Sequence, residues 1–74
     1  MTRLPRGLNS KKVIKALIRA NFIVKRIRGS HVIMIKRNPF KSVVVPTHKA
    51  IDTGTLDKII KDSGLTLDEF LDLL

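Results

Sequence analysis

The 74-residue sequence contains no cysteine. Neither a disulfide framework nor a zinc site with thiolate ligands can therefore hold the fold together, and the absence of cysteine favours a reducing cytoplasm. The sequence also has no apolar run near the roughly 20 residues of a membrane span, and residues 1–6 lack the hydrophobic region of a signal peptide. We expect one small cytoplasmic domain over residues 1–74, with no membrane association.

Acidic side chains are missing from residues 1–51, which carry 13 Lys and Arg. Residues 52–74 hold six acidic and two basic side chains, so the net charge is 13 − 4 = +9. A basic field of this kind attracts polyanions and speeds their encounter, with an affinity that falls as salt rises. Nucleic acid or an acidic protein is the favoured partner, and a solvated surface that only confers solubility is the alternative.

Aromatic side chains are scarce, and the three phenylalanines are the only ones. Phe22 and Phe70 fall at positions typical of a core, which leaves little support for recognition of bases by stacking.

Hydrophobic periodicity predicts a helix followed by three strands. Residues 11–20 have the apolar side chains Val13, Ile14, Leu17 and Ile18 on one stripe at helical spacing, with Asn9 or Ser10 as the cap and Asn21 at the end. Strands are expected at residues 22–28, 31–37 and 42–45, separated by Gly29 and by Asn38-Pro39 and closed by Pro46. Short connections between them indicate an antiparallel meander.

The helical period returns after Asp52. Thr53 or Thr55 can cap a second helix that ends at Gly64, and Thr66 with Glu69 fits a capping box for a short C-terminal helix. The fold class is therefore α+β, in the order α-β-β-β-α with a last short helix, and we expect the helices on one face of a three-stranded antiparallel sheet.

His31 is the best candidate for chemistry. A catalytic metal is not favoured, because the chain lacks cysteine and its few carboxylates lie in the C-terminal third of a cationic protein. RNA cleavage by the 2′-hydroxyl needs only proton transfer and cations for the phosphorane charge. An imidazole ordinarily titrates near pH 6.5, so His31 can be the acid or base, with Lys25, Arg26, Arg28 and Lys36 as candidate phosphate ligands. A strand histidine bonded to a backbone carbonyl, and an exposed loop position for His48, are the structural alternatives.

The face of the sheet that carries His31 stays open. In a regular strand His31 shares a face with Ile33 and Ile35, while Val32 and Met34 share the other. If His31 is on the uncovered face, the two isoleucines form an apolar patch suited to a protein partner.

Five motifs follow one another along the chain. They are the helical segment 11–20 with Phe22, then Gly29-Ser30-His31, Val45-Pro46-Thr47-His48, Gly54-Thr55-Leu56 with Ile59-Ile60, and Gly64-Leu65-Thr66 with Glu69-Phe70. In this order the motifs resemble the HicA-type mRNA interferase toxins. The resemblance implies a fold like the double-stranded RNA-binding domain and a metal-independent endoribonuclease that cleaves mRNA without a cofactor. It also implies the toxin role in a type II toxin–antitoxin system, with a HicB-like antitoxin as partner.

The resemblance maps the family's catalytic histidine onto His31. Gly29 and Ser30 would position it, and His48 is a possible secondary site residue whose role the resemblance does not assign. Asn21 stands where the family commonly has glycine, and asparagine can take the same cap conformation. A non-catalytic RNA-binding module of the same fold is the main competing interpretation, and a protein that acts only through a protein partner is the third.

Overall fold

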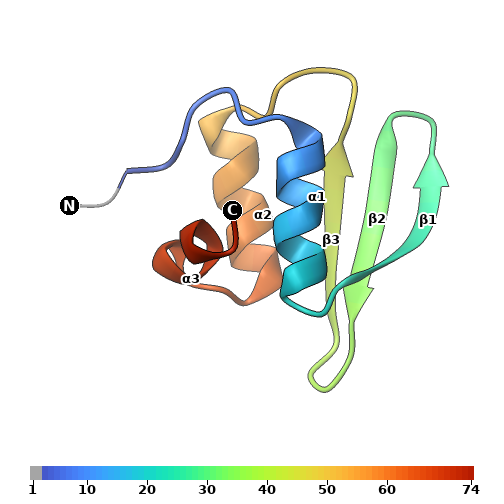
Figure 1. The fold of residues 1–74 in the computed structure, drawn as a ribbon. Coiled ribbons are helices and arrows are strands. Elements are labelled where there is room, and N and C mark those ends of the chain that lie inside the picture. Colours follow the sequence, from blue (N-terminus) through green and yellow to red (C-terminus); the bar gives the residue numbers. More distant parts are fainter. Residues whose placement is uncertain (1–2) are drawn as a thin grey trace.

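The computed structural model describes residues 3–74, which fold into a sheet with a layer of helices against it (Figure 1). Within this part of the chain, no helix has the length and apolarity needed to cross a membrane. The elements follow the predicted order: α1 (Ser10–Arg19), β1 (Ile23–Arg28), β2 (His31–Lys36), β3 (Lys41–Pro46), α2 (Thr53–Ser63) and α3 (Leu67–Asp72).

Helix α1 begins at the predicted cap, because the Asn9 side chain accepts a hydrogen bond of 2.7 Å from the backbone N–H of Lys11. Asn21 follows the helix with φ 74°, the left-handed conformation expected for it. The buried stripe is Val13, Ala16 and Leu17, whereas Ile18, which the periodicity placed on it, is half exposed. The stripe is narrower than predicted, so Ile18 lies outside the contact with the sheet.

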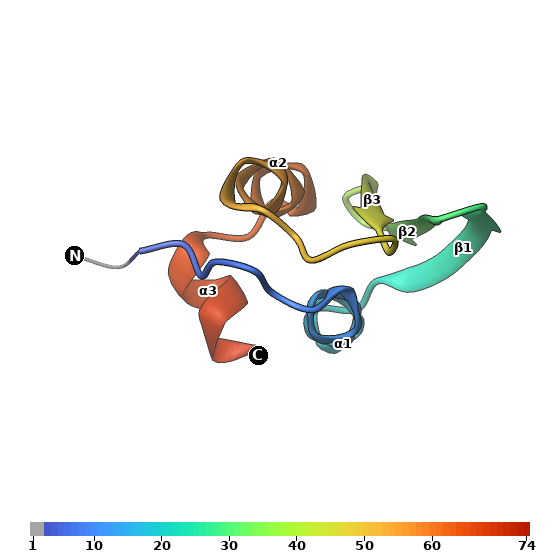
Figure 2. The same cartoon turned by 90° about the horizontal axis from the view of Figure 1, so that it is seen from above.

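The sheet is an antiparallel meander in the order β1-β2-β3. One face is packed against the helices, and its side chains Val32, Met34, Val43 and Val45 join Leu17, Phe22, Leu56 and Phe70 in the core. Figure 2 shows α1 and α2 beside β3, with β1 extending away from both helices. The helices therefore cover one face, as predicted, and leave β1 beyond the helical layer.

Strand β1 is an exposed edge strand with an irregularity. Its apolar side chains Ile23, Val24 and Ile27 are 62%, 44% and 67% exposed. The register shifts between Val24 and Arg26, which leaves Lys25 as the extra residue of a β-bulge. A bulge reverses the alternation of side chains that a regular strand would have, so the residues after it exchange faces.

Helices α2 and α3 are both capped by side chains at their N-termini. Asp52 caps α2 by accepting the Thr55 N–H at 2.7 Å, so the expectation of a threonine cap was wrong. A carboxylate one residue earlier in the chain takes the bond instead, and its negative charge also suits the helix N-terminus. The capping box of Thr66 and Glu69 is present as predicted, and Gly64 ends α2 with φ 78°.

Candidate functional site

His31 is the first residue of β2 and lies on the face of the sheet that the helices leave open. It alternates with Val32 and Met34, which belong to the core, and its own side chain is exposed. The open-face position predicted as one of two possibilities is therefore the one observed. An exposed imidazole at the end of a strand can meet a ligand without any part of the core moving.

Two arginines share this face because of the bulge in β1. Arg28 pairs directly with His31, and Arg26 pairs with Ile33, the next residue of β2 on the same face. Paired residues in an antiparallel sheet are about 4.5–5.5 Å apart at Cα, so Arg28 is the direct neighbour of His31 on β1. A guanidinium can hold a phosphate through two hydrogen bonds, and both arginines are exposed.

The other two predicted phosphate ligands are placed differently. Lys25 is the extra residue of the bulge, three residues before Arg28. Lys36 lies at the opposite end of β2 from His31 and on the helix side, where its Nζ is 5.4 Å from the centre of the Phe22 ring. The structure brings Arg26 and Arg28 to His31 and does not bring Lys36 there.

Gly29 and Ser30 form the turn between β1 and β2, directly before His31. Gly29 has φ 58°, a backbone conformation that residues other than glycine adopt only at an energetic cost. The Ser30 carbonyl accepts two hydrogen bonds from Thr47, one from the backbone N–H at 2.7 Å and one from Oγ1 at 2.9 Å. The turn before His31 is thereby joined to the segment after β3.

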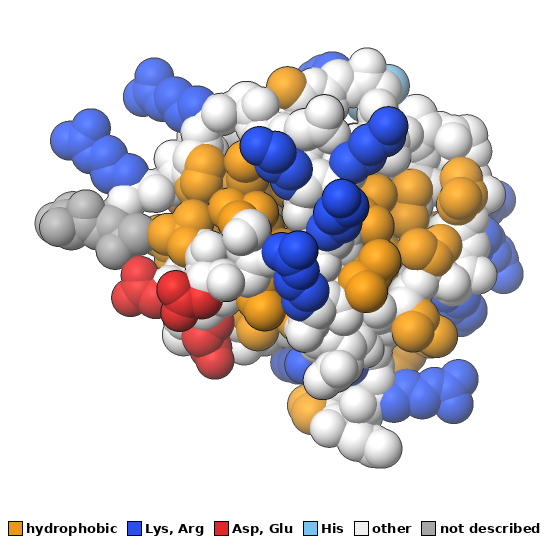
Figure 3. Space-filling model, in the orientation of Figure 1, with side chains coloured by type: hydrophobic (Ala, Val, Ile, Leu, Met, Phe, Trp, Pro, Cys, Tyr) orange, Lys and Arg blue, Asp and Glu red, His pale blue; other side chains and the backbone are white. Residues whose placement is uncertain are grey.

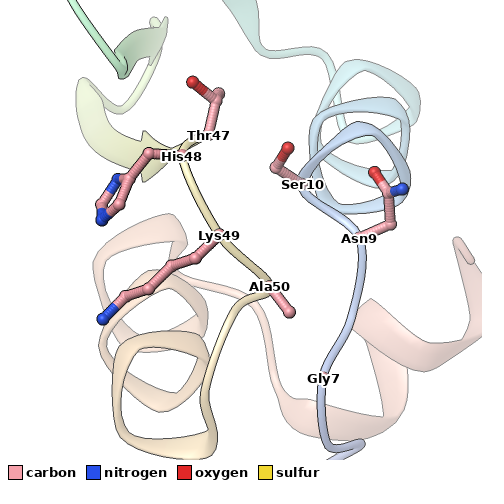
Figure 4. A pocket seen from close by; sticks show the side chains of 7 residues that line it. All are labelled: Gly7, Asn9, Ser10, Thr47, His48, Lys49 and Ala50. Carbon is pink, nitrogen blue, oxygen red and sulfur yellow. The ribbon is translucent and has the colours of Figure 1, made fainter.

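That segment carries His48, whose ring centre is 6.5 Å from the ring centre of His31, with 67° between the ring planes. Its other end is fixed where the N–H of Ile51, a core residue, donates to the Leu8 carbonyl at 2.8 Å. Figure 4 shows the side chains of His48 and Lys49 projecting to one side of the segment, away from Ser10 and Asn9. Between the segment and the start of α1 is a shallow cavity of about 250 Å³.

The end of the molecule that holds these residues is electrostatically positive. The turn before β2, the end of β3 and the N-termini of α1 and α2 all lie at this end (Figure 1), so the positive ends of two helix dipoles add to Arg28 and Lys49. Asp52 is the acidic residue here, and hydrogen bonds from Thr55, helped by the charge of Lys49, lower the pKa of its carboxyl group. Asp52 is therefore an ionised helix cap.

The other charges are distributed over the helices. Figure 3 shows Lys and Arg side chains in a column over α1, whose basic residues are Lys11, Lys12, Lys15 and Arg19, and acidic side chains gathered over α3. Within residues 3–74, no group of three or more His, Cys, Asp and Glu side chains is placed to hold a metal ion.

Apolar side chains continue along the open face beyond His31. Ile33 is half-buried, its β3 partner Val44 is exposed, and Ile23 of β1 pairs with Ile35. Ile35 is only 5% exposed but lies outside the core cluster, so its burial occurs on the open face. The patch formed by Ile23, Ile33, Ile35 and Val44 adjoins the arginines and is called here the open-face patch.

Sequence reasoning missed the proximity of His48 to His31 and the common face of Arg26 and Arg28. The first depends on the pairing of His31 with Pro46, which places the residues after β3 beside the start of β2. The predicted end of a strand at Pro46 and the start of another at His31 were the available signals. Nothing in the residue types marks the bulge at Lys25.

Comparison with known proteins identifies the family. The family described as HicA toxin of bacterial toxin–antitoxin systems matches residues 10–65, which run from the first residue of α1 to just beyond α2 and include His31 and His48. The comparison with curated proteins gives no match. A match over this much of a 74-residue chain, with the α-β-β-β-α order in place, means that the protein belongs to the HicA toxin family of bacterial toxin–antitoxin systems.

Proposed function

We propose that this toxin is an endoribonuclease that cleaves mRNA, with His31 as a proton-transfer residue and without a metal ion. The observation that carries the proposal is the placement of an exposed imidazole directly across from Arg28, with Arg26 on the same face. A proton carrier beside phosphate-binding cations is what attack by a ribose 2′-hydroxyl requires.

The chemistry uses a nucleophile that the substrate brings. The 2′-oxygen attacks the adjacent phosphorus while His31 takes its proton or protonates the departing 5′-oxygen. Arg28 holds the non-bridging phosphate oxygens, on which negative charge increases as the transition state forms. Arg26, two residue pairs further along the strand, binds the neighbouring phosphate and keeps the RNA in line with the sheet.

Cleavage of a labelled mRNA fragment in the presence of EDTA tests the proposal. We expect the parent protein to cut, and His31→Ala to cut at least about 100-fold more slowly, since acid–base catalysis contributes roughly 10²–10⁴ in rate. The side chain is exposed, so the variant should keep the parent's unfolding temperature and its RNA affinity.

Equal cutting by the parent and His31→Ala would refute the assignment of His31. Salt-sensitive binding without cleavage by either protein would instead favour the non-catalytic RNA-binding module.

We further propose that the cognate antitoxin is a HicB-like protein that masks His31. The open-face patch supports this, because its apolar side chains lie next to the site and suit contact with a protein rather than with RNA. In the complex, the NMR titration of the His31 imidazole should shift or disappear. An unchanged titration would contradict masking.

A further inference from the structure

We propose that His48 is a second catalytic residue, which forms an acid–base pair with His31 across the scissile phosphate. The inference rests on the proposed ribonuclease function and gives His48 a role in it. The proposal requires that the two imidazoles can contact the same phosphate group, that the backbone holds them at a suitable distance, and that each transfers a different proton.

The separation suits a shared ligand. With the ring centres 6.5 Å apart, the nitrogens of the two rings cannot reach hydrogen-bond distance of each other, whichever way the rings are turned. A phosphate group between them can be reached from both sides, since a catalytic hydrogen bond spans about 2.6–3.2 Å. The ring planes are inclined by 67°, so the rings do not stack, and both side chains are exposed to solvent.

The backbone on both sides of His48 is held in place by hydrogen bonds. Thr47, the residue before it, is tied to the Ser30 carbonyl by two hydrogen bonds, and Ser30 immediately precedes His31. Ile51, three residues after His48, is buried in the core and bonded to Leu8. An exposed histidine in an ordinary loop has no such restraint, whereas catalysis by proximity depends on it.

The reaction balances with two imidazoles. A neutral imidazole takes the proton from the 2′-hydroxyl as the bond from the 2′-oxygen to phosphorus forms. The bond from phosphorus to the 5′-oxygen breaks, and the protonated imidazole of the pair gives its proton to that oxygen. The products are a 2′,3′-cyclic phosphate and a 5′-hydroxyl end, and the imidazoles return to their starting states by proton exchange with water.

The test is the pH dependence of kcat/KM for the parent, His48→Ala and His31→Ala. The charged groups nearest the pair along the chain and across the sheet are Arg28, which pairs with His31, and Lys49 and Asp52, which follow His48. Histidine is the side-chain type whose charge ordinarily changes between pH 5 and 8, so a bell-shaped profile would report the coupled pair. Each histidine variant should lose one limb of the bell, a different limb in each case.

His48→Ala should also slow cleavage by roughly 10²-fold or more, and added free imidazole should restore part of the rate. Phe40→Ala is the matched control, since it removes another exposed ring, at the turn before β3 at the far end of the sheet. It should cleave like the parent, with both limbs present.

The outcomes separate this inference from the proposed function. Parent-like cleavage by His48→Ala, or slow cleavage with both limbs intact, would overturn the role of His48 while leaving His31 as the catalytic residue. Failure of the parent protein to cleave RNA would refute the ribonuclease function itself.

Thr47 is the positioning residue of this pair, and its variants give a second test. Thr47→Val removes the Oγ1 bond to Ser30 and keeps the backbone bond, so cleavage should fall severalfold with both pH limbs retained. Thr47→Ser restores the hydroxyl and should recover the parent rate. If the serine variant is as slow as the valine variant, the hydroxyl does not set the separation of the two imidazoles.

Discussion

Removing Arg26 and Arg28 together should weaken RNA binding through the loss of two specific phosphate contacts. Both side chains lie on the open face with His31, and one of them is its cross-strand partner. In the variant Arg26→Ala/Arg28→Ala the net charge falls from +9 to +7, by subtraction of the two arginines. The question is whether the position of these charges matters, or only their number.

The expected magnitude follows from counterion release. Each phosphate contact on a single strand contributes about 0.7 to the slope of log affinity against log salt concentration, so two lost contacts should reduce that slope by about 1.4. Over a fourfold rise in salt, the difference amounts to about sevenfold in relative affinity. The measurement is fluorescence anisotropy with a labelled single-stranded RNA, from about 50 to 200 mM salt, with His31→Ala added to both proteins to prevent cleavage.

Lys58→Ala/Lys61→Ala provides a control with the same change of net charge. Both lysines lie on α2 and form ion pairs, Lys58 with Asp62 at 3.0 Å and Lys61 with Asp57 at 2.8 Å. The slope for this variant should stay near that of the parent. If the slope of log affinity against log salt falls equally in the two double variants, or if it is unchanged in the arginine variant, the arginines are not the phosphate ligands.

Three further predictions concern stability. Gly64→Ala should destabilise the fold by about 1 kcal/mol, because φ is 78° there. Gly54→Ala should instead stabilise it by up to about 1 kcal/mol, because alanine is favoured over glycine in a helix and the added Cβ meets only Asp52 Oδ1, at 3.6 Å. Denaturant unfolding measures both. Met34→Ala, in the core, should lower the free energy of unfolding by about 2–5 kcal/mol. Ile33→Ala, one residue away on the open face, should lower it clearly less. Asp52→Asn should be less stable than the parent near neutral pH, and this difference should disappear in acid. The folded-state pKa of Asp52 is lowered, so its charge stabilises the fold above the ordinary pKa of 3.8. That stabilisation is lost as the pH falls through the folded-state pKa.

Each of these predictions has a clear contrary result. Equal losses at the two glycines would show that backbone conformation does not decide the effect. Equal losses at Met34 and Ile33 would mean that the open face is as tightly packed as the core. A stability deficit of Asp52→Asn that stays constant as the pH falls through the ordinary pKa of 3.8 and further into acid would mean that the charge of the cap contributes nothing.

The fold was largely predictable because its signals are local. The caps at Asn9 and Thr66, the glycine at 64 and the change from helical to alternating periodicity each depend on residues a few positions apart. The cap of α2 was missed because three residues that can cap a helix, Asp52, Thr53 and Thr55, occur within four positions. Composition alone does not choose among them.

The candidate site was predictable in part. His31 stood out because few other residues in the chain can move a proton near neutral pH, and the cationic half supplied candidate ligands for phosphate. Four such ligands were proposed, and the structure brings Arg26 and Arg28 to the imidazole while Lys36 lies at the other end of β2, over Phe22. Which cations share a face with His31 depends on strand register, which a sequence of similar basic residues does not reveal.

By itself the sequence determined the order of the elements, the separation of charge along the chain and the choice of His31, because each of these depends on residue type and on spacing within a few positions. The tertiary structure decided what lies around His31. The bulge at Lys25 turned Arg26 and Arg28 toward the open face, and the bonds from Thr47 to Ser30 brought His48 to 6.5 Å from His31. Both results arise from hydrogen bonds between neighbouring segments of the folded chain, and so no local pattern of residue types records them.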